Sequence, residues 1–535
     1  MGERFLTRGF IAFSAALVAA ICIPSAFAGN VKGDFDGDGY ADLAIGAPWE
    51  DLRGPEDAGV VIVLYGSAEG LSATDSQRWN QNVRGIQDEA EIGDQFGRDL
   101  AAGDFDGDGF SDLAVGVPGE DLRDDPACDD ATFPCEDVGA VAVLYGSNTG
   151  LTARDQFWTQ ASPGVADTLG EFEYFGDSLA AANFGNGRRA DLAIGVNEDV
   201  GAGDEAGAVH VLYGASGGLS TKGSQFWHQN RPGIVGRAES LDHFGDSLAA
   251  ADFGKSAHAD LAVGVFNEDL PGAGGAGAVA VLYGSSGGLS AAGDQLWHQG
   301  RPGIEDDPEF QDFFGEVLSA ANFGKSGGYA DLAIGVPEED LGASTSAGVV
   351  HVLYGTAAGL SATGAQLWTE DADGVEDTVE IYDHFGDALV AANFGNGSYA
   401  DLAIGVPGET VGDPAVASAG AVDVLYGSTE GLAATGAQFW YEDAAGLPGS
   451  PEESDFFGSD LAGADFDGSG HADLAVGITG EDLGVIMGAG AVDVIYGTPS
   501  GLSGTDSEQW NQDTPGVLDK AEEGDAFGWS FAARR

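Results

Sequence analysis

Two short segments place aspartates at alternate positions of a glycine-containing loop, DFDGDGYAD at residues 34–42 and DFDGDGFSD at residues 104–112. Carboxylates at loop positions 1, 3, 5 and 9, with glycines that permit a tight turn, provide the hard oxygen ligands that Ca²⁺ prefers. The backbone carbonyl at position 7 is a further expected ligand. The predicted Ca²⁺ ligands are Asp34, Asp36, Asp38, Tyr40 and Asp42 in the first loop and Asp104, Asp106, Asp108, Phe110 and Asp112 in the second.

A third segment, DFDGSGHAD at residues 465–473, has serine at position 5 and is also expected to bind Ca²⁺. Its predicted ligands are Asp465, Asp467, Ser469, His471 and Asp473. An EF-hand is excluded, because position 12 of the first loop is Ile45, inside an apolar run, where an EF-hand needs a bidentate glutamate.

Four related segments lack most of these carboxylates. One keeps only Asp252 and Asp260, and we treat it as a doubtful site. The other three begin with Asn183, Asn322 and Asn393 and have glycine at position 3, so we expect side-chain to backbone hydrogen bonds to hold their turns without a metal.

The elements that must position these loops belong to an internal repeat. The pattern that opens with Asp or Asn and ends in Asp-Leu-Ala-Ile/Val-Gly occurs seven times, about 70 residues apart, which is longer than the 40 to 50 residues of the familiar propeller families. Each copy continues with a Gly-Ala-Val-x-Val-Leu-Tyr-Gly run, a Gly-Leu turn, a tryptophan, an acidic stretch and Phe-Gly before another apolar run. Short runs of this composition between glycine and aspartate turns predict strands.

Four strands per repeat and seven repeats predict an all-β fold, a seven-bladed β-propeller of four-stranded antiparallel blades. The first copy has little room for its Phe-Gly strand, and the chain finishes with Phe527-Gly528-Trp529-Ser530-Phe531. We therefore expect the last strand to complete the first blade and close the ring, which protects free sheet edges. The tryptophan of each repeat is expected to fill the gap between neighbouring blades.

The first 28 residues indicate export. A basic start with Arg4 and Arg8, an apolar run and Ala26-Phe27-Ala28 are typical of a signal peptide, so residues 1–28 are assigned to it and residues 29–535 to the propeller. Lipidation of Cys22 is the alternative. Cys128 and Cys135 lie close together in the longest repeat, and we expect them to form a local disulfide.

The charge restricts the partners. With 88 acidic and 20 basic side chains, the formal net charge is −68, which excludes a nucleic-acid partner. Three explanations of the acidic composition remain open, namely cation binding, attraction of basic ligands and adaptation to a salty medium. No apolar run reaches the roughly 20 residues of a membrane span. We expect a monomer with a secreted, extracellular or periplasmic location.

The repeats also resemble a known family. The Phe-Gly landmarks, the aspartate-rich loops and the Gly-Ala-Pro-like runs, such as IGAP at residues 45–48 and VGVP at residues 115–118, resemble the FG-GAP repeats of integrin α-subunit propellers and their bacterial relatives. Three copies depart from this run and read IGVN, VGVF and VGIT. The resemblance implies Ca²⁺ in the hairpin loops of some blades and ligand binding on the opposite face.

Catalytic patterns are weak. Two Gly-x-Ser-x-Gly matches, at residues 214–218 and 284–288, fall in a turn that all repeats share, and every histidine occupies a repeated position. We therefore predict a non-enzymatic, calcium-binding adhesion or ligand-binding module whose partner is an extracellular protein or glycan. The alternatives are a carbohydrate-binding propeller and, less favoured, a carboxylate-dependent hydrolase or lyase on the acidic face. Tryptophans exposed in open pockets would favour the carbohydrate-binding reading.

Overall fold

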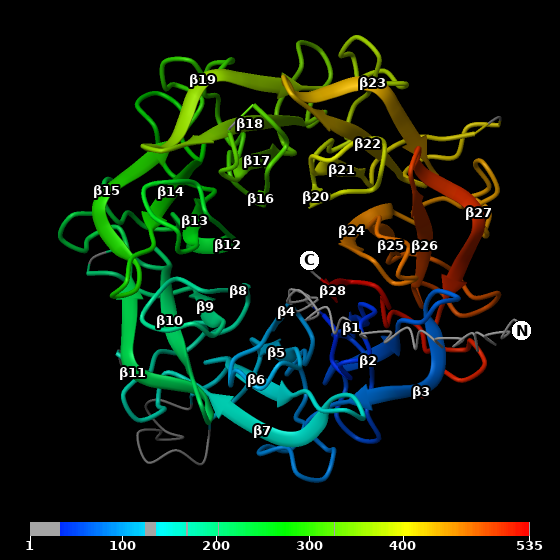
Figure 1. Ribbon diagram of the computed structural model, residues 1–535, viewed down its shortest axis with the longest axis horizontal. Helices are drawn as coiled ribbons and strands as arrows, with labels where there is room; N and C mark the ends of the chain where they lie inside the picture. Colours follow the sequence, from blue (N-terminus) through cyan, green and yellow to red (C-terminus); the bar gives the residue numbers. More distant parts are fainter. Residues whose placement is uncertain are drawn as a thin grey trace, which may run out of the picture.

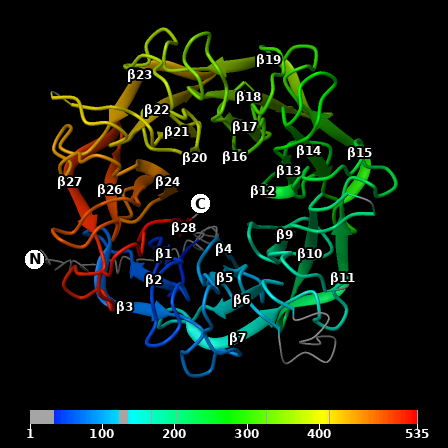
Figure 2. The same ribbon diagram turned by 180° about the vertical axis from the view of Figure 1, so that it is seen from behind.

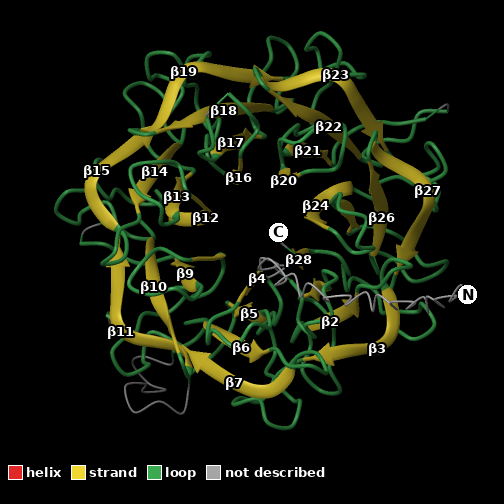
Figure 3. Cartoon of the chain, in the orientation of Figure 1, coloured by secondary structure: helices red, strands yellow, loops and turns green. Residues whose placement is uncertain are grey.

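The computed structural model describes residues 33–122, 135–166, 169–201, 203–325, 327–412 and 414–533. Seven four-stranded antiparallel sheets form a ring, with one strand of each sheet near the centre and one at the rim (Figure 1). The same order is visible from behind (Figure 2), and the described residues contain strands and loops but no helix (Figure 3). The prediction of a seven-bladed propeller is confirmed. The signal peptide and Cys128 lie outside the described residues, so export and the disulfide stay predictions.

The four strands of each blade are called A to D from the centre outward. The A strands follow the Phe-Gly landmark or begin at it: β28 (Ser530–Ala532), β4 (Leu100–Gly103), β8 (Leu179–Ala182), β12 (Phe244–Ala251), β16 (Val317–Ala321), β20 (Ala388–Ala392) and β24 (Phe457–Ala464). The B strands follow the aspartate loops: β1 (Leu43–Ala47), β5 (Asp112–Val117), β9 (Asp191–Val196), β13 (Asp260–Val265), β17 (Asp331–Val336), β21 (Asp401–Val406) and β25 (Asp473–Ile478).

The C strands contain the Val-Leu-Tyr run: β2 (Val60–Tyr65), β6 (Ala140–Tyr145), β10 (Ala208–Ala215), β14 (Ala278–Tyr283), β18 (Val349–Thr356), β22 (Ala421–Ser428) and β26 (Ala491–Thr498). The D strands end at the repeated tryptophan: β3 (Ser72–Trp79), β7 (Thr152–Trp158), β11 (Gly218–Trp227), β15 (Ser290–Trp297), β19 (Gly359–Trp368), β23 (Gly431–Trp440) and β27 (Gly501–Trp510). The B strands are buried along their whole length, because each lies inside a blade that packs against two neighbours.

The last strand closes the ring. β28 pairs antiparallel with β1, with Ile45 opposite Phe531 and Gly46 opposite Ser530. The first blade therefore combines the end of the chain with the first repeat, as the sequence predicted. Each B strand then pairs with its C strand in a fixed register, for example Leu43 with Leu64.

The Phe-Gly landmark joins neighbouring blades. Phe96 precedes β4 of the second blade, is fully buried, and its amide donates a hydrogen bond of 3.0 Å to the Ala58 carbonyl of the first blade. Gly59 lies against it with φ of 79°, and a Cβ at this position would meet the Phe96 carbonyl oxygen at 2.4 Å. Only glycine fits this close approach, which explains why Phe-Gly and Gly-Ala recur together.

Candidate metal centre

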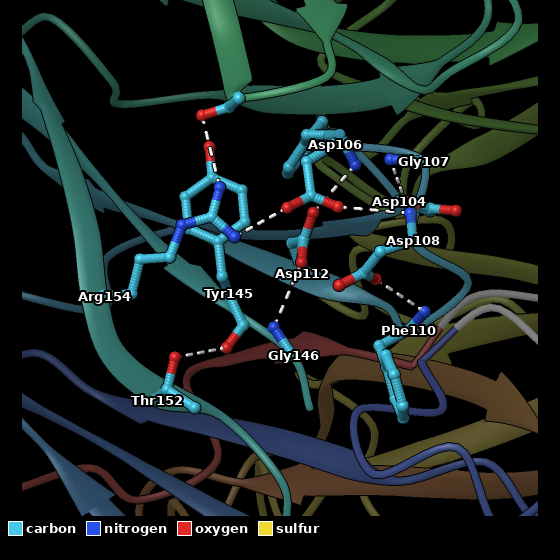
Figure 4. Close-up of polar contacts among 12 residues, drawn as sticks. Asp104, Asp106, Gly107, Asp108, Phe110, Asp112, Tyr145, Gly146, Thr152 and Arg154 are labelled. Atoms are coloured by element: carbon cyan, nitrogen blue, oxygen red, sulfur yellow. Dashed lines mark hydrogen bonds and ion pairs between the residues drawn. The ribbon is translucent and has the colours of Figure 1, made fainter. Parts of the chain in front are cut away.

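The three aspartate-rich loops adopt the same compact turn, which the first aspartate organises. Asp34 accepts hydrogen bonds from the amides of Gly37 at 2.6 Å, Asp38 at 3.1 Å and Gly39 at 3.1 Å. Asp104 does the same for Gly107, Asp108 and Gly109, part of which is drawn in Figure 4. In the third loop Asp465 accepts from Gly470 at 3.0 Å. The loop backbone thus folds around position 1, and two further carboxylates of each loop approach it.

In each loop at least three carboxylates converge. One oxygen from each member of the set lies within 4.8 Å of the others, the spacing that a single ion could bridge. The sets are Asp34, Asp36 and Asp42; Asp104, Asp106 and Asp108; and Asp465, Asp467 and Asp473. Asp38 and Asp112 are predicted ligands outside these sets. The carbonyls of Tyr40, Phe110 and His471 and the hydroxyl of Ser469 stay predicted ligands.

The aspartate at position 9 has a structural role that sequence reasoning missed. Asp42 accepts hydrogen bonds from the amides of Phe35 at 2.7 Å and Gly66 at 3.0 Å, which ties the loop to the end of strand C. The equivalent pair of bonds occurs in all seven blades, made by Asp112, Asp191, Asp260, Asp331, Asp401 and Asp473 in the others. Position 9 therefore holds the blade together with or without a metal, and positions 1, 3 and 5 decide whether the loop can bind one.

Burial and mutual repulsion make the loop carboxylates costly to ionise without a counter-charge. Burial, with the neighbouring aspartates adding to it, raises the pKa of Asp34 and of Asp104 above the ordinary range. Burial raises the pKa of Asp112 and of Asp473 to about 8. A dication among these groups would offset the repulsion, because an opposite charge favours the ionised carboxylate.

In the part of the chain that the structure describes, arginines contact the second loop but not the first, and one of them pairs with a predicted ligand, whereas Arg189 donates to the Asp106 backbone carbonyl at 2.7 Å. Arg154 on β7 donates from Nη1 to Asp106 Oδ2 at 2.6 Å, and its guanidinium stacks over the Tyr145 ring (Figure 4). The residue equivalent to Arg154 in the first blade is Thr74. One oxygen of Asp106 is thus held by an arginine, whereas Asp36 has no ion pair among the described residues.

The degenerate loops keep their turns by hydrogen bonds, as expected. Asn183, Asn322 and Asn393 each accept from the glycine amide two residues further on, at 2.9 to 3.1 Å. In the doubtful loop Asp252 makes the same bond, and the positive charge of Lys255 acts on Asp260. Among the described residues Asp252 and Asp260 join no group of three candidate ligands, so this loop is the weakest of the predicted sites.

The three complete loops lie side by side across the ring closure. They belong to the seventh, first and second blades, and the amide of Ala41 donates to the Asp465 carbonyl at 3.1 Å while that of Ser111 donates to the Asp34 carbonyl at 2.9 Å. A Cβ at Gly37 would meet the ring of Phe110 at 2.5 Å, so adjacent loops also pack directly. The ends of the sequence thus supply one continuous acidic surface.

The opposite face carries the B to C and D to A connections. Several D to A connections expose a large apolar side chain close to their buried carboxylate, and Phe310 is 73% exposed. The other members are Ile92, Phe172, Leu241 and Ile381. Exposed apolar groups that recur around one acidic face are typical of an interaction surface.

The two serine-containing motifs and two of the histidines occupy structural positions. The two Gly-x-Ser-x-Gly segments form the turns between β10 and β11 and between β14 and β15. His210 and His351 are buried, and burial lowers the pKa of each to about 3, so both stay neutral. The tryptophans that end the D strands are buried or half-buried, as expected for side chains that fill the space between blades.

Comparisons with known proteins agree with the repeat pattern. A family model described as FG-GAP repeat matches residues 29–64 and 96–144. Integrin alpha-PS2 of Drosophila melanogaster is 32% identical over 246 residues, which cover 45% of this chain and 15% of the relative. Phosphatidylinositol-glycan-specific phospholipase D of Bos taurus is 31% identical over 184 residues, which cover 34% of this chain and 20% of the relative. The chain thus matches only a small part of each relative's length.

A solved rhamnogalacturonan lyase from Bacillus licheniformis has a TM-score of 0.38 and 12% identity, covering 83% of this chain and 68% of that chain, a likeness too low to support an argument about function. The structure contains no helix among its described residues that could cross a membrane.

Proposed function

We propose that this chain, which carries FG-GAP repeats and resembles the integrin α-subunits, is a secreted, calcium-binding module that recognises an extracellular ligand without catalysis. The convergence of Asp34, Asp36 and Asp42 within 4.8 Å, repeated in two neighbouring loops, carries the proposal. Oxygen ligands in a tight, glycine-permitted turn match the coordination that Ca²⁺ prefers.

Bound calcium would stabilise the ring at the point where it closes. The three loops contact one another across the seventh, first and second blades, where the two ends of the chain meet. Ions in these loops would offset the repulsion among adjacent carboxylates and so stabilise the place where the ring can open. An ion that binds only the folded state adds stability by mass action.

The ligand is proposed to bind the face opposite the calcium loops. That face combines exposed apolar side chains, such as Phe310 and Ile381, with the acidic connections between strands. This combination suits an extracellular protein with basic and apolar groups. The burial of Trp79, Trp227, Trp297 and Trp440 favours this reading over the carbohydrate-binding alternative, because these rings lie between blades and are not open to a sugar.

Two measurements test the proposal. Calorimetry of the mature chain should show Ca²⁺ binding that Asp36→Asn, Asp106→Asn and Asp467→Asn together reduce by three ions. Saturable binding of basic extracellular proteins should be lost in Phe310→Ser with Ile381→Ser and kept in Asp75→Ser, which changes the rim. An unchanged calcium stoichiometry in the triple variant would contradict the loop sites, and glycan-array binding with no protein binding would favour the carbohydrate alternative.

A further inference from the structure

A glutamine two residues after the D-strand tryptophan links neighbouring blades at five boundaries. Its side-chain amide donates to a glutamate in the B to C connection of the next blade, for example from Gln299 to Glu339 at 2.6 Å. The other pairs are Gln81 with Glu120, Gln160 with Glu198, Gln229 with Glu268 and Gln512 with Glu50. At each of these boundaries a neutral amide thus donates to the buried glutamate of the B to C connection.

The boundary between the blades of β16–β19 and β20–β23 replaces this glutamine with a third carboxylate. Glu370 lies two residues after Trp368, at the position of the glutamine. Its carboxylate lies close to those of Asp383 in the D to A connection and Glu409 in the next B to C connection. One oxygen of each lies within 4.8 Å of the others, and each residue is only 1% exposed. None of the ion pairs between described residues involves them.

A fourth carboxylate at the same boundary is the second, independent observation. Asp423 lies in β22, is fully buried, and neither of its oxygens has a hydrogen-bond partner among the described residues. Its charge acts on Glu370, so it lies near the cluster, although it is not one of the three carboxylates whose oxygens converge. The equivalent position holds Ile62, Ala142, His210, Ala280 and His351 in the first five blades.

The two replacements occur together. The next boundary also has glutamate after its tryptophan, Glu442, and aspartate in its C strand, Asp493, and these are the two boundaries that lack the glutamine. There Gln509 donates to Glu442 at 3.3 Å, which supplies part of the missing polar contact. The cluster of Glu370 has no such amide, because both Glu370 oxygens lack a conventional hydrogen-bond donor among the described residues.

Three buried carboxylates that converge, with a fourth close by, need a positive partner or protons. Burial raises the pKa of Glu409 and of Asp423 to about 8, with neighbouring acidic groups adding to the effect. Carboxylate oxygens without histidine or cysteine select hard cations such as Ca²⁺, Mg²⁺ and Mn²⁺ over softer metals. The three ligands come from just after β19, from the connection before β20 and from the B to C connection of the next blade, so one ion would join two blades.

We propose that Glu370, Asp383 and Glu409 bind one divalent, oxygen-preferring cation at this boundary, and that Asp423 adds negative charge beside it. The site lies at the opposite end of the blades from the aspartate loops, since these loops join A to B strands whereas Asp383 and Glu409 lie in the D to A and B to C connections. The proposed cation site does not depend on the aspartate-loop sites or on the extracellular ligand.

The test uses the full mature chain and a matched variant. Glu370→Gln with Asp423→His copies Gln299 and His351 of the preceding boundary, so the fold already contains this combination. The chain with the native cluster and the chain with the matched pair of changes both carry Asp36→Asn, Asp106→Asn and Asp467→Asn. The Ca²⁺ and Mn²⁺ bound to each are counted after equilibrium dialysis. The expected result is one fewer bound ion in the matched variant, with a cooperative thermal transition kept.

Equal numbers of bound ions with and without the matched pair of changes would overturn the proposal. Protons shared among the carboxylates would then be what neutralises their charge. Anomalous diffraction from wild-type crystals soaked in Mn²⁺ gives a readout that needs no variant. A peak between Glu370 and Glu409 supports the site, and its absence from data with bound Mn²⁺ in the loops overturns it. Because the loop ions are removed or seen separately, failure here is distinguishable from failure of the proposed function.

Discussion

Tyr496 donates a hydrogen bond of 3.0 Å to Glu508 Oε2 at the boundary where the ring closes, whereas the equivalent tyrosine of every other blade contacts a glutamine. Each of those six glutamines also donates its side-chain amide to a leucine carbonyl of the next blade, for example Gln77 to Leu151 at 3.0 Å. Glutamate has no amide to donate, so the closing boundary has lost one bond that the others keep.

Glu508→Gln is therefore expected to stabilise the protein. The new amide can donate to the carbonyl of Leu71, and the substitution removes a carboxylate whose pKa is raised by burial. A single hydrogen bond of this kind contributes about 1 kcal/mol. Urea unfolding checks the change in the free energy of unfolding, and Gln77→Glu is the reverse control, which should lose a similar amount. A Glu508→Gln protein no more stable than wild type would show that the closing boundary uses another contact.

Calcium removal is expected to lower the melting temperature through the three loops. At a Ca²⁺ concentration of 100 times Kd, each independent site adds about 2.7 kcal/mol of stability. Scanning calorimetry with Ca²⁺ and with chelator at matched, high ionic strength separates specific binding from salt effects. Asp36→Asn with Asp106→Asn should remove most of the gain, and the same changes at the exposed Asp75 and Asp506 should not. If chelator has no effect on wild type, salt adaptation is the better account of the acidic composition.

The second loop should bind Ca²⁺ more weakly than the first because Arg154 holds Asp106 Oδ2 at 2.6 Å. Arg154→Thr copies Thr74 of the first blade and frees that oxygen for the ion. We expect tighter calcium binding in the second loop, measured by calorimetry in the Asp36→Asn, Asp467→Asn background, where this loop is the remaining aspartate-loop site. Thr74→Arg is the reciprocal variant for the first loop. Weaker binding in Arg154→Thr would mean that the arginine positions Asp106 for the metal.

Stability should fall as the pH rises, in part through Glu339. Burial raises the pKa of Glu339 to about 9, so the folded protein keeps a proton that the unfolded chain releases near pH 4. The unfolded state then binds fewer protons, and the free energy of unfolding decreases between about pH 4 and pH 9. Glu339→Gln removes this dependence, and its amide can donate to Gln299 Oε1, which lacks a partner among the described residues.

Urea unfolding at pH 5 and pH 8 measures this difference. Glu339→Gln should lose less stability than wild type over the interval, and at pH 8 we expect it to be more stable by about 1 to 3 kcal/mol, the cost of a buried unsatisfied group. Asp307→Asn, an exposed change in the preceding connection, is the control and should follow the wild-type slope. If the free energy of unfolding changes equally with pH in wild type and in Glu339→Gln, a group other than Glu339 is responsible for the pH dependence.

The repeat, the four strands of each blade, the closure by the final strand and the three aspartate loops could all be predicted from the residues and their spacing. These features are local: alternating aspartates and glycines specify a loop, and short apolar runs between turns specify strands. The predicted ligands at positions 1 and 3 followed from spacing alone, and Asp34 with Asp36 and Asp104 with Asp106 do converge.

The contacts across blade boundaries could be identified only from the three-dimensional structure. It placed the loops of the seventh, first and second blades side by side, gave the aspartate at position 9 its two backbone hydrogen bonds, and brought Glu370 to Glu409 and Asp423. Each contact joins residues from different strands or blades whose distance depends on how the sheets twist and pack. A strand pattern fixes which face a side chain occupies but not what lies opposite it, so the buried carboxylates emerge only when the ring is closed.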